Sequence, residues 1–187
     1  YYAGVEKGLH KGSATEFGEE AWFNTLSRAY GIEEVLMRHS AIMDHYDPEK
    51  KIGMMVDEWG CWHDVEPGTN PGFLYQQNTM RDALTAGVSL NIFNKHCDRI
   101  KMACIAQIVN VLQSVILTEG KKMLLTPTYH VFHMYKYHQD ADLVESWLEG
   151  AGKTGVKETE MVPEVQESVS VDENGVLTVT LNNLCTE

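Results

Sequence analysis

Apolar residues in the first quarter of the chain recur at intervals of three and four positions, which is the period of a helix with one buried face. This pattern predicts a helix from Ala21 to Tyr46. Ser13 and Thr15 stand ahead of it as candidate N-cap residues, because their hydroxyl groups can accept hydrogen bonds from the first helical N–H groups. We expect the helix to end at Asp47-Pro48, since the residue before a proline avoids helical backbone angles.

Short apolar runs then alternate with helical periods. The continuous apolar run at residues 52–56 is typical of a strand buried on both faces in a parallel sheet, and residues 61–72 form a loop rich in Pro and Gly. A second helical pattern covers residues 73–94, and a second buried-strand pattern covers residues 100–106. Residues 108–117 indicate a brief helix or a helix-like return. Strands separated by amphipathic helices predict βαβ units with a parallel sheet, and therefore an α/β fold.

The pattern changes again after Gly120. Residues 127–138 favour one more helix with Pro127 in its first turn, although their aromatic density also permits a strand. Residues 150–157 indicate a loop, and residues 165–181 alternate around the turn sequence Asp-Glu-Asn-Gly, which predicts a β-hairpin. A β-type module is therefore expected to follow the α/β part, with the boundary between residues 125 and 145.

Charge and hydropathy exclude two classes of partner. The chain has 15 Lys and Arg against 27 Asp and Glu, a formal net charge of −12, which would repel a phosphate backbone and argues against nucleic acid. No apolar run approaches the roughly 18 residues that span a bilayer, so no membrane partner is expected. The four cysteines form no Cys-x-x-Cys pair and are expected to be reduced and mostly buried.

The strongest candidate chemistry lies at Asp57 and Glu58, where a predicted strand ends. In parallel α/β folds the carboxyl ends of the strands form the functional face. Alternation along the strand puts the two acids on opposite faces, so they cannot act as a pair. If Val56 faces a barrel interior, Glu58 stands at its mouth, and Trp59 and Trp62 offer flat surfaces on which sugars stack. The alternative is that both acids only cap the following turn.

A metal site at the histidines is the weaker alternative. His130 and His133 are spaced to share a helix face, and Cys61 or His138 could complete a ligand set. The ligands would have to converge from unrelated segments, so packed histidines are favoured. We therefore expect neither a metal nor a cofactor.

A series of short blocks along nearly the whole chain resembles glycoside hydrolase family 51, whose members are mainly α-L-arabinofuranosidases. In order, the blocks are Tyr1–Tyr2, Lys11–Thr15, Met43–Pro48, Val56–Gly60, Asn70–Phe73, Thr79–Ala83, Leu90–Asn94, Ile105–Val111 and Leu125–Tyr129. The resemblance implies a (β/α)8 TIM barrel followed by a C-terminal all-β sandwich. Residues 1–125 would then form the last third of the catalytic barrel, and residues 126–187 a linking helix and the start of the sandwich.

The resemblance also implies a retaining mechanism with Glu58 as the nucleophile at the end of the seventh barrel strand. It implies that Gln107 and one tyrosine of the Tyr1-Tyr2 pair, with Tyr2 favoured over Tyr1, hold the furanose ring by hydrogen bonds and that Trp62 lines the site. The implied substrates are terminal α-L-arabinofuranosyl units of arabinan, arabinoxylan or arabino-oligosaccharides, and the implied assembly is a homo-oligomer.

The acid/base residue of the resembled family is the glutamate of an Asn-Glu pair on the fourth barrel strand. No Asn-Glu pair occurs in this chain, and by order it would precede Tyr1. A retaining glycosidase needs both carboxyl groups. We therefore expect the isolated chain to be inactive. The alternative is a non-catalytic piece with a structural or carbohydrate-contacting role.

Overall fold

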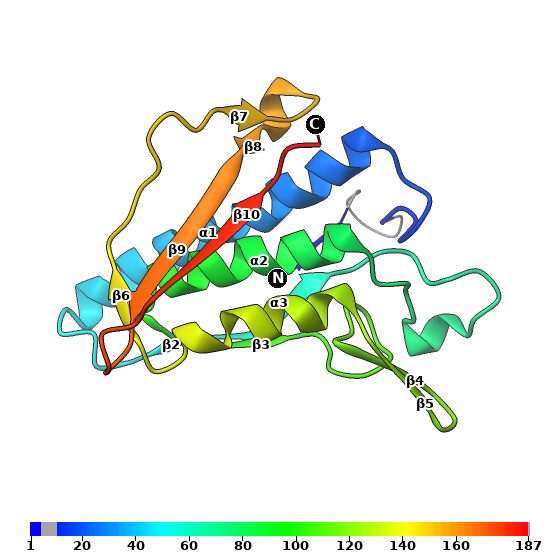
Figure 1. Cartoon of the computed structure of the whole chain (residues 1–187), viewed down its shortest axis with the longest axis horizontal. Coiled ribbons are helices and arrows are strands. Elements are labelled where there is room, and N and C mark those ends of the chain that lie inside the picture. The colour runs from blue at the N-terminus through cyan, green and yellow to red at the C-terminus, as the bar shows by residue number, and fades with distance from the viewer. Residues whose placement is uncertain (5–10, 187) are drawn as a thin grey trace.

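The computed structural model describes residues 1–4 and 11–186, and its helices and strands alternate in the first half of the chain (Figure 1). No helix in this part of the chain combines the length and the apolar character needed to cross a bilayer. The elements are β1 (Tyr2–Ala3), α1 (Glu19–Tyr46), β2 (Met54–Cys61), η1 (Pro71–Phe73), α2 (Met80–Lys95), β3 (Ile100–Ile105), β4 (Ile116–Glu119), β5 (Lys122–Leu125), α3 (Pro127–Tyr135), η2 (Lys136–His138), β6 (Asp142–Val144), β7 (Lys153–Thr154), η3 (Glu158–Glu160), β8 (Val162–Pro163), β9 (Val165–Val171) and β10 (Leu177–Asn183).

A three-stranded parallel sheet in the order β1-β2-β3 confirms the predicted α/β arrangement. Figure 1 shows α1, α2 and α3 lying along this sheet, and α2 packs against both other helices. The core between helices and sheet contains Phe23 and Leu26 of α1, Val88 and Ile92 of α2, and Trp59 of β2. Burial of these apolar side chains is the main force that fixes the sheet relative to the helices.

Asp47 ends α1, as predicted, and shapes the turn that leads to β2. Its carboxylate accepts hydrogen bonds from the backbone N–H groups of Lys51, at 3.1 Å, and Ile52, at 2.8 Å. It also accepts a 2.8 Å hydrogen bond from the guanidinium of Arg99, whose side chain is buried just before β3. One carboxylate thus ties the end of the helix to the starts of two neighbouring strands.

The helix starts differ from the sequence-based expectation. Ser13 does not cap α1, since its hydroxyl accepts from the N–H groups of Thr15 and Glu16 in a local turn, and Gly18 precedes the helix without a side-chain cap. The second helix begins at Met80, where Thr79 and Asp82 form a capping box, rather than at residue 73. Capping chemistry therefore sets the start of α2, which hydrophobic period alone placed too early, whereas α1 begins two residues before the predicted Ala21 without a side-chain cap.

The predicted helix at residues 108–117 is wrong. The chain runs irregularly there and then forms the β4–β5 hairpin, in which Ile116 lies opposite Leu125. Asn110 and Leu112 have positive φ angles of 59° and 51°, which a helix cannot contain. The Asn110 side chain instead exchanges hydrogen bonds with Thr118, which fixes a turn in place of a helix.

The second half of the chain follows its predicted pattern more closely. Residues 127–135 are helical, and the Thr126 hydroxyl caps them by accepting from the N–H of Tyr129. The predicted hairpin is confirmed as β9 and β10, with Asp172 accepting two backbone hydrogen bonds in the turn. The predicted loop at 150–157 contains the short strand β7, paired with β8.

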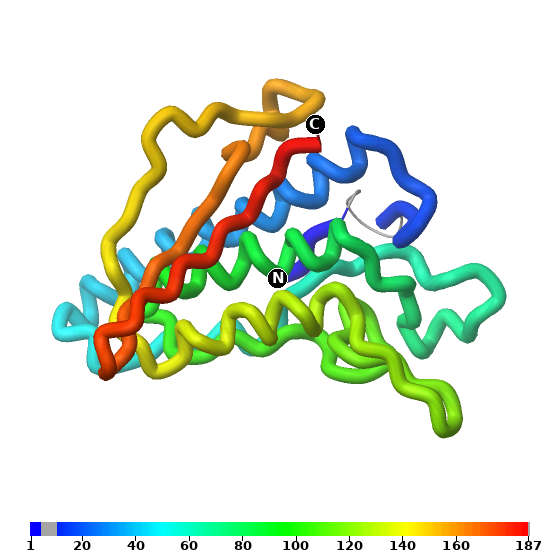
Figure 2. The backbone as a smooth tube through the Cα atoms, viewed as in Figure 1, coloured from blue at the N-terminus to red at the C-terminus, as the bar shows by residue number. Residues whose placement is uncertain are grey.

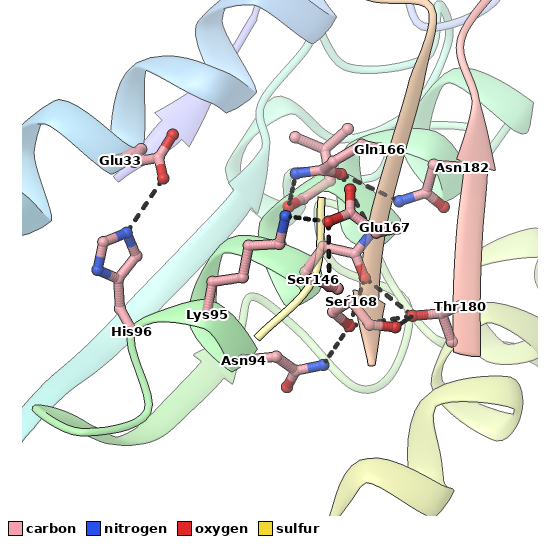
Figure 3. Close-up of polar contacts among 12 residues, drawn as sticks. Glu33, Asn94, Lys95, His96, Ser146, Gln166, Glu167, Ser168, Thr180 and Asn182 are labelled. Carbon is pink, nitrogen blue, oxygen red and sulfur yellow. Dashed lines mark hydrogen bonds and ion pairs between the residues drawn. The ribbon is translucent and has the colours of Figure 1, made fainter. Parts of the chain in front are cut away.

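A second, antiparallel sheet in the order β10-β9-β6 lies on α2 (Figure 2). The contact surface is polar, as Figure 3 shows, although it is largely buried. Asn91 of α2 accepts hydrogen bonds from the hydroxyl groups of Ser168, at 2.9 Å, and Thr180, at 3.0 Å. Lys95 forms an ion pair with the buried Glu167 at 2.6 Å. The sheet is therefore held on α2 by directional contacts.

His138 adds a pH-dependent contribution to this surface. Its ring nitrogens lie 2.8 Å from the Ser170 hydroxyl and 3.1 Å from that of Thr180, and burial lowers its pKa below the ordinary value of 6.5. The unfolded chain therefore takes up this proton first as the pH falls, and stability is lost below about pH 6.5. We expect His138→Asn to lose less unfolding free energy than the wild type between about pH 7 and pH 5 in urea titrations. His39→Asn, at an exposed position of α1, should behave like the wild type. If the unfolding free energy changes with pH equally in the wild type and both variants, His138 does not have this role.

Candidate active site

Glu58 lies at the carboxyl end of β2, next to a local irregularity in strand pairing. Val56 pairs with Ala103 and Trp59 pairs with Ile105, so β2 has one more residue than β3 between these two pairs. Such a bulge interrupts the alternation of side chains. As a result Val56 and Trp59 both pack against the core under the helices, and Glu58 between them is exposed. Val56 therefore packs on the helix side of β2, so the condition under which Glu58 was placed at the mouth of a barrel is not met by Val56.

Tyr2 lies beside Glu58, and Trp62 lies against Tyr2. β1 pairs with the end of β2, with Tyr2 opposite Gly60, and the Tyr2 hydroxyl donates a short hydrogen bond to Oε1 of Glu58. The Tyr2 and Trp62 rings meet edge to face, with centroids 5.1 Å apart, and the Lys11 ammonium lies 4.8 Å from the Trp62 ring centroid. Burial, together with the hydrogen bond to Glu58, raises the pKa of Tyr2, so the phenol keeps the proton that it donates.

Gln107 follows β3, the strand next to β2. Its backbone is fixed by hydrogen bonds with Val111 and Val115, and Gln107 is exposed to solvent. It lines a cavity of about 1090 Å³ between the loop around Phe73 and the β4–β5 hairpin. Glu58 is not part of the lining of this cavity, so the structure brings Gln107 to the same end of the sheet without a direct contact to the nucleophile candidate.

Trp59 was expected to offer a surface for sugar, and this is wrong. Its residue is only 1% exposed, and its ring lies 5.3 Å from that of Phe93 and 6.2 Å from that of Phe132, measured between centroids. The bulge in β2 turns this side chain toward the helices. Trp59 is therefore a core residue that anchors the strand carrying Glu58.

Buried amide side chains support the end of β2, and sequence analysis did not identify them. The Gln113 amide accepts a 2.8 Å hydrogen bond from the N–H of Cys61 and donates one of 2.6 Å to the carbonyl of Asp82. Gly60 has φ +151°, and a Cβ there would lie 3.3 Å from both the Gln113 amide oxygen and the Ala106 carbonyl. Glutamines amid apolar neighbours were the only sequence signal for this support.

The histidines proposed as metal ligands do not converge in the part of the chain that the structure describes. His130 and His133 lie on α3 and pack against Tyr129, whereas His138 contacts the second sheet. All four cysteines are unpaired, as predicted, but only Cys61 is fully buried. The expectation of mostly buried thiols is therefore wrong, since Cys97 and Cys104 are exposed.

Known proteins are similar to this chain in fold and in sequence. Residues 57–185 match the model of the α-L-arabinofuranosidase C-terminal domain family. The chain is 50% identical over 184 residues to an intracellular exo-α-L-arabinofuranosidase of Bacteroides ovatus, which covers 98% of this chain and 36% of that protein. It superposes with a TM-score of 0.94 on the crystal structure of the GH51 arabinofuranosidase from Xanthomonas axonopodis pv. citri, at 48% identity, covering 98% of this chain and 37% of that one.

A more distant solved structure shows the same fold. The α-L-arabinofuranosidase of Thermotoga maritima, solved as an arabinose complex, matches with a TM-score of 0.71 at 22% identity and covers 89% of this chain and 36% of that one. The chain thus spans little more than a third of the length of these relatives. The family model and the 50% identical relative agree with the sequence blocks, and the chain belongs to glycoside hydrolase family 51, the α-L-arabinofuranosidases.

Proposed function

We propose that this chain supplies the nucleophile and part of the sugar site of a retaining α-L-arabinofuranosidase. The observation that carries the proposal is the hydrogen bond from Tyr2 to Glu58 at the end of β2, beside the Trp62 ring. The proposed substrates are terminal α-L-arabinofuranosyl units of arabinan, arabinoxylan or arabino-oligosaccharides. The names of the relatives, which are arabinofuranosidases, support this choice.

The proposed reaction proceeds in two steps. A carboxylate oxygen of Glu58 attacks C1 of the arabinofuranosyl unit, and the bond from C1 to the leaving oxygen breaks while a second carboxyl group protonates that oxygen. Water then attacks C1 of the glycosyl ester, gives its proton to the second carboxylate and releases Glu58. Tyr2 holds the attacking carboxylate in position, and Gln107 is proposed to hold hydroxyl groups of the sugar. The second carboxyl group is not supplied by an Asn-Glu pair of this sequence.

The proposed setting is the last third of a (β/α)8 barrel at residues 1–125, followed by a linking helix and the start of an all-β sandwich at residues 126–187. The outer strands of the parallel sheet, β1 and β3, support it, because each has one side without a partner strand among the described residues. An apolar cavity of about 550 Å³ also lies beside β3. A closed barrel would pair both edges. The homo-oligomeric state stays a prediction.

A direct test compares the chain alone with a longer form that completes the barrel. We expect the longer form to hydrolyse an aryl α-L-arabinofuranoside and the chain alone to show no turnover, because leaving-group protonation requires the second carboxyl group. An aryl β-D-xylopyranoside serves as the control substrate. Equal turnover of the arabinofuranoside by both forms would favour a complete site within the chain, and no turnover by the longer form would contradict the proposed activity. The second outcome would favour a structural role.

Gln107→Ala in the longer form tests the proposed contact with the sugar. A lost buried hydrogen bond to the transition state should cost about 1–3 kcal/mol, which lowers kcat/KM roughly 5- to 150-fold. Gln139→Ala is the matched control, since Gln139 is exposed on the loop after η2. If kcat/KM is the same in both variants, Gln107 does not bind the sugar.

A further inference from the structure

A thiol, an imidazole and a carboxylate form a buried cluster behind Trp62. The sulfur of Cys61, a ring nitrogen of His63 and a carboxylate oxygen of Asp82 all lie within 4.8 Å of one another. All three residues are at most 1% exposed. In residues 1–4 and 11–186 this is the one group of three or more such side chains with the spacing of a metal site.

The end of β2 and the first turn of α2 bring these side chains together. Cys61 ends β2 and His63 follows two positions later, so an extended backbone directs both to the same side, with Trp62 on the other. The backbone N–H of His63 donates a 2.8 Å hydrogen bond to the Gln76 amide oxygen, which fixes this segment. Asp82 enters from the first turn of α2, where one of its oxygens accepts from the N–H and hydroxyl of Thr79. Its other oxygen accepts a long, 3.5 Å hydrogen bond from the Gln76 amide, and the Cys61 thiol lies within hydrogen-bonding reach of the carboxylate.

Neither ring nitrogen of His63 makes a well-formed hydrogen bond, although its residue is 1% exposed, and the backbone of Lys11 gives it at most a weak one. A buried polar group without a partner is unfavourable, and native structures rarely keep one without a reason. A neutral imidazole offers a ring-nitrogen lone pair, which is the form that binds metal ions.

We propose that Cys61, His63 and Asp82 bind one Zn²⁺ ion. Sulfur, imidazole nitrogen and carboxylate oxygen are the ligands that zinc prefers, and together they favour it over Mg²⁺ or Ca²⁺. Ligand atoms about 2.0–2.3 Å from a tetrahedral zinc lie about 3.5 Å from one another, so the cluster has to contract by about 1 Å. The fourth position is left to a water molecule or the Gln76 amide oxygen.

The two anionic ligands balance the charge of the ion itself, while the buried Arg81 beside them adds one further positive charge. Zinc displaces the proton of the Cys61 thiol to solvent and binds the thiolate. The thiolate and the Asp82 carboxylate then neutralise the two charges of the ion. Arg81 lies beside the cluster but keeps its own contacts, a 2.9 Å hydrogen bond to the carbonyl of Ser13 and a position 3.7 Å from the Phe17 ring centroid.

The ion would fix the segment that carries Trp62. Two of the three ligands flank this tryptophan, whose ring contacts Tyr2. The metal is thus a positioning element, because none of its ligands touches Glu58. The proposal stands independently of the glycosidase reaction.

Titration of the metal-free chain with Co²⁺ tests the site without relying on activity. We expect one equivalent of cobalt to bind with a thiolate-to-cobalt charge-transfer band, and one equivalent of Zn²⁺ to abolish the band. Metal analysis after dialysis should return one zinc per chain, and zinc should raise the Tm. A wild-type chain that shows no stoichiometric cobalt band and no retained zinc would overturn the proposal, whatever the variants do.

Variants assign the ligands. Cys61→Ser should abolish the band, whereas Cys97→Ser and Cys104→Ser, at exposed thiols, should keep it. His63→Phe keeps the thiol and should weaken zinc binding roughly 100-fold, as should Asp82→Asn if it folds. Circular dichroism identifies any variant that does not fold. A charge-transfer band that persists in folded Cys61→Ser would move the site to another cysteine and overturn the proposal.

Discussion

Glu58→Ala in the barrel-completing form is expected to lower kcat for an aryl α-L-arabinofuranoside on the order of 10⁴-fold or more, because the proposed mechanism assigns the covalent intermediate to this carboxylate. The activity should be lost through removal of the carboxylate and not through unfolding, because the Glu58 side chain is exposed at the end of β2 and supports no part of the core. Initial rates and circular dichroism on the same sample separate loss of chemistry from loss of fold.

Added azide provides the sharper measurement. With the carboxylate removed, azide can attack C1 from the vacant side, and it should restore part of the rate while forming a β-L-arabinofuranosyl azide. Glu173→Ala, in the exposed turn between β9 and β10, is the control and should keep full activity without an azide effect. Full activity of Glu58→Ala would show that the nucleophile is another residue.

Trp59→Ala should have the largest effect on stability, a loss of about 3–5 kcal/mol of unfolding free energy. The indole is buried between Phe93 and Phe132, and its removal leaves a cavity at the point where β2 meets the helices. Urea unfolding followed by circular dichroism measures the change in midpoint at constant slope.

Trp147→Ala is the matched control for this substitution. Trp147 is 73% exposed, so its replacement should change the unfolding free energy by no more than about 0.5 kcal/mol. If the two variants unfold at the same urea concentration, Trp59 does not anchor the strand in the way described.

Hydrophobic periodicity predicted correctly those helices and strands whose structure is determined by neighbouring residues alone. The helix ending before Pro48 and the hairpin around Gly175 follow from hydrophobic spacing and turn chemistry over neighbouring residues. The structure around Asn110 could not be predicted in this way, because its left-handed backbone is stabilised by a contact with Thr118, which follows eight residues later in the chain. A pattern of apolar residues contains no information about such a contact.

The candidate site was predictable to a different degree at each residue. Glu58 could be placed at a strand end from the sequence, but the bulge that exposes it depends on its pairing with β3. Tyr2 was identified only through the family resemblance, since a tyrosine at the start of a chain has no pattern around it. The cluster of Cys61, His63 and Asp82 was not predicted, because Asp82 lies on α2 and a long loop separates it in sequence from Cys61 and His63.

The hydrogen-bonded surface between α2 and the second sheet restricts how these parts can move. Apolar surfaces can slide over each other at little cost, whereas a shift of one residue here would separate Asn91 from Ser168 and Thr180 at once. A movement of β9 and β10 that kept these hydrogen bonds would carry α2 with it, and with α2 the end of the helix that holds Asp82.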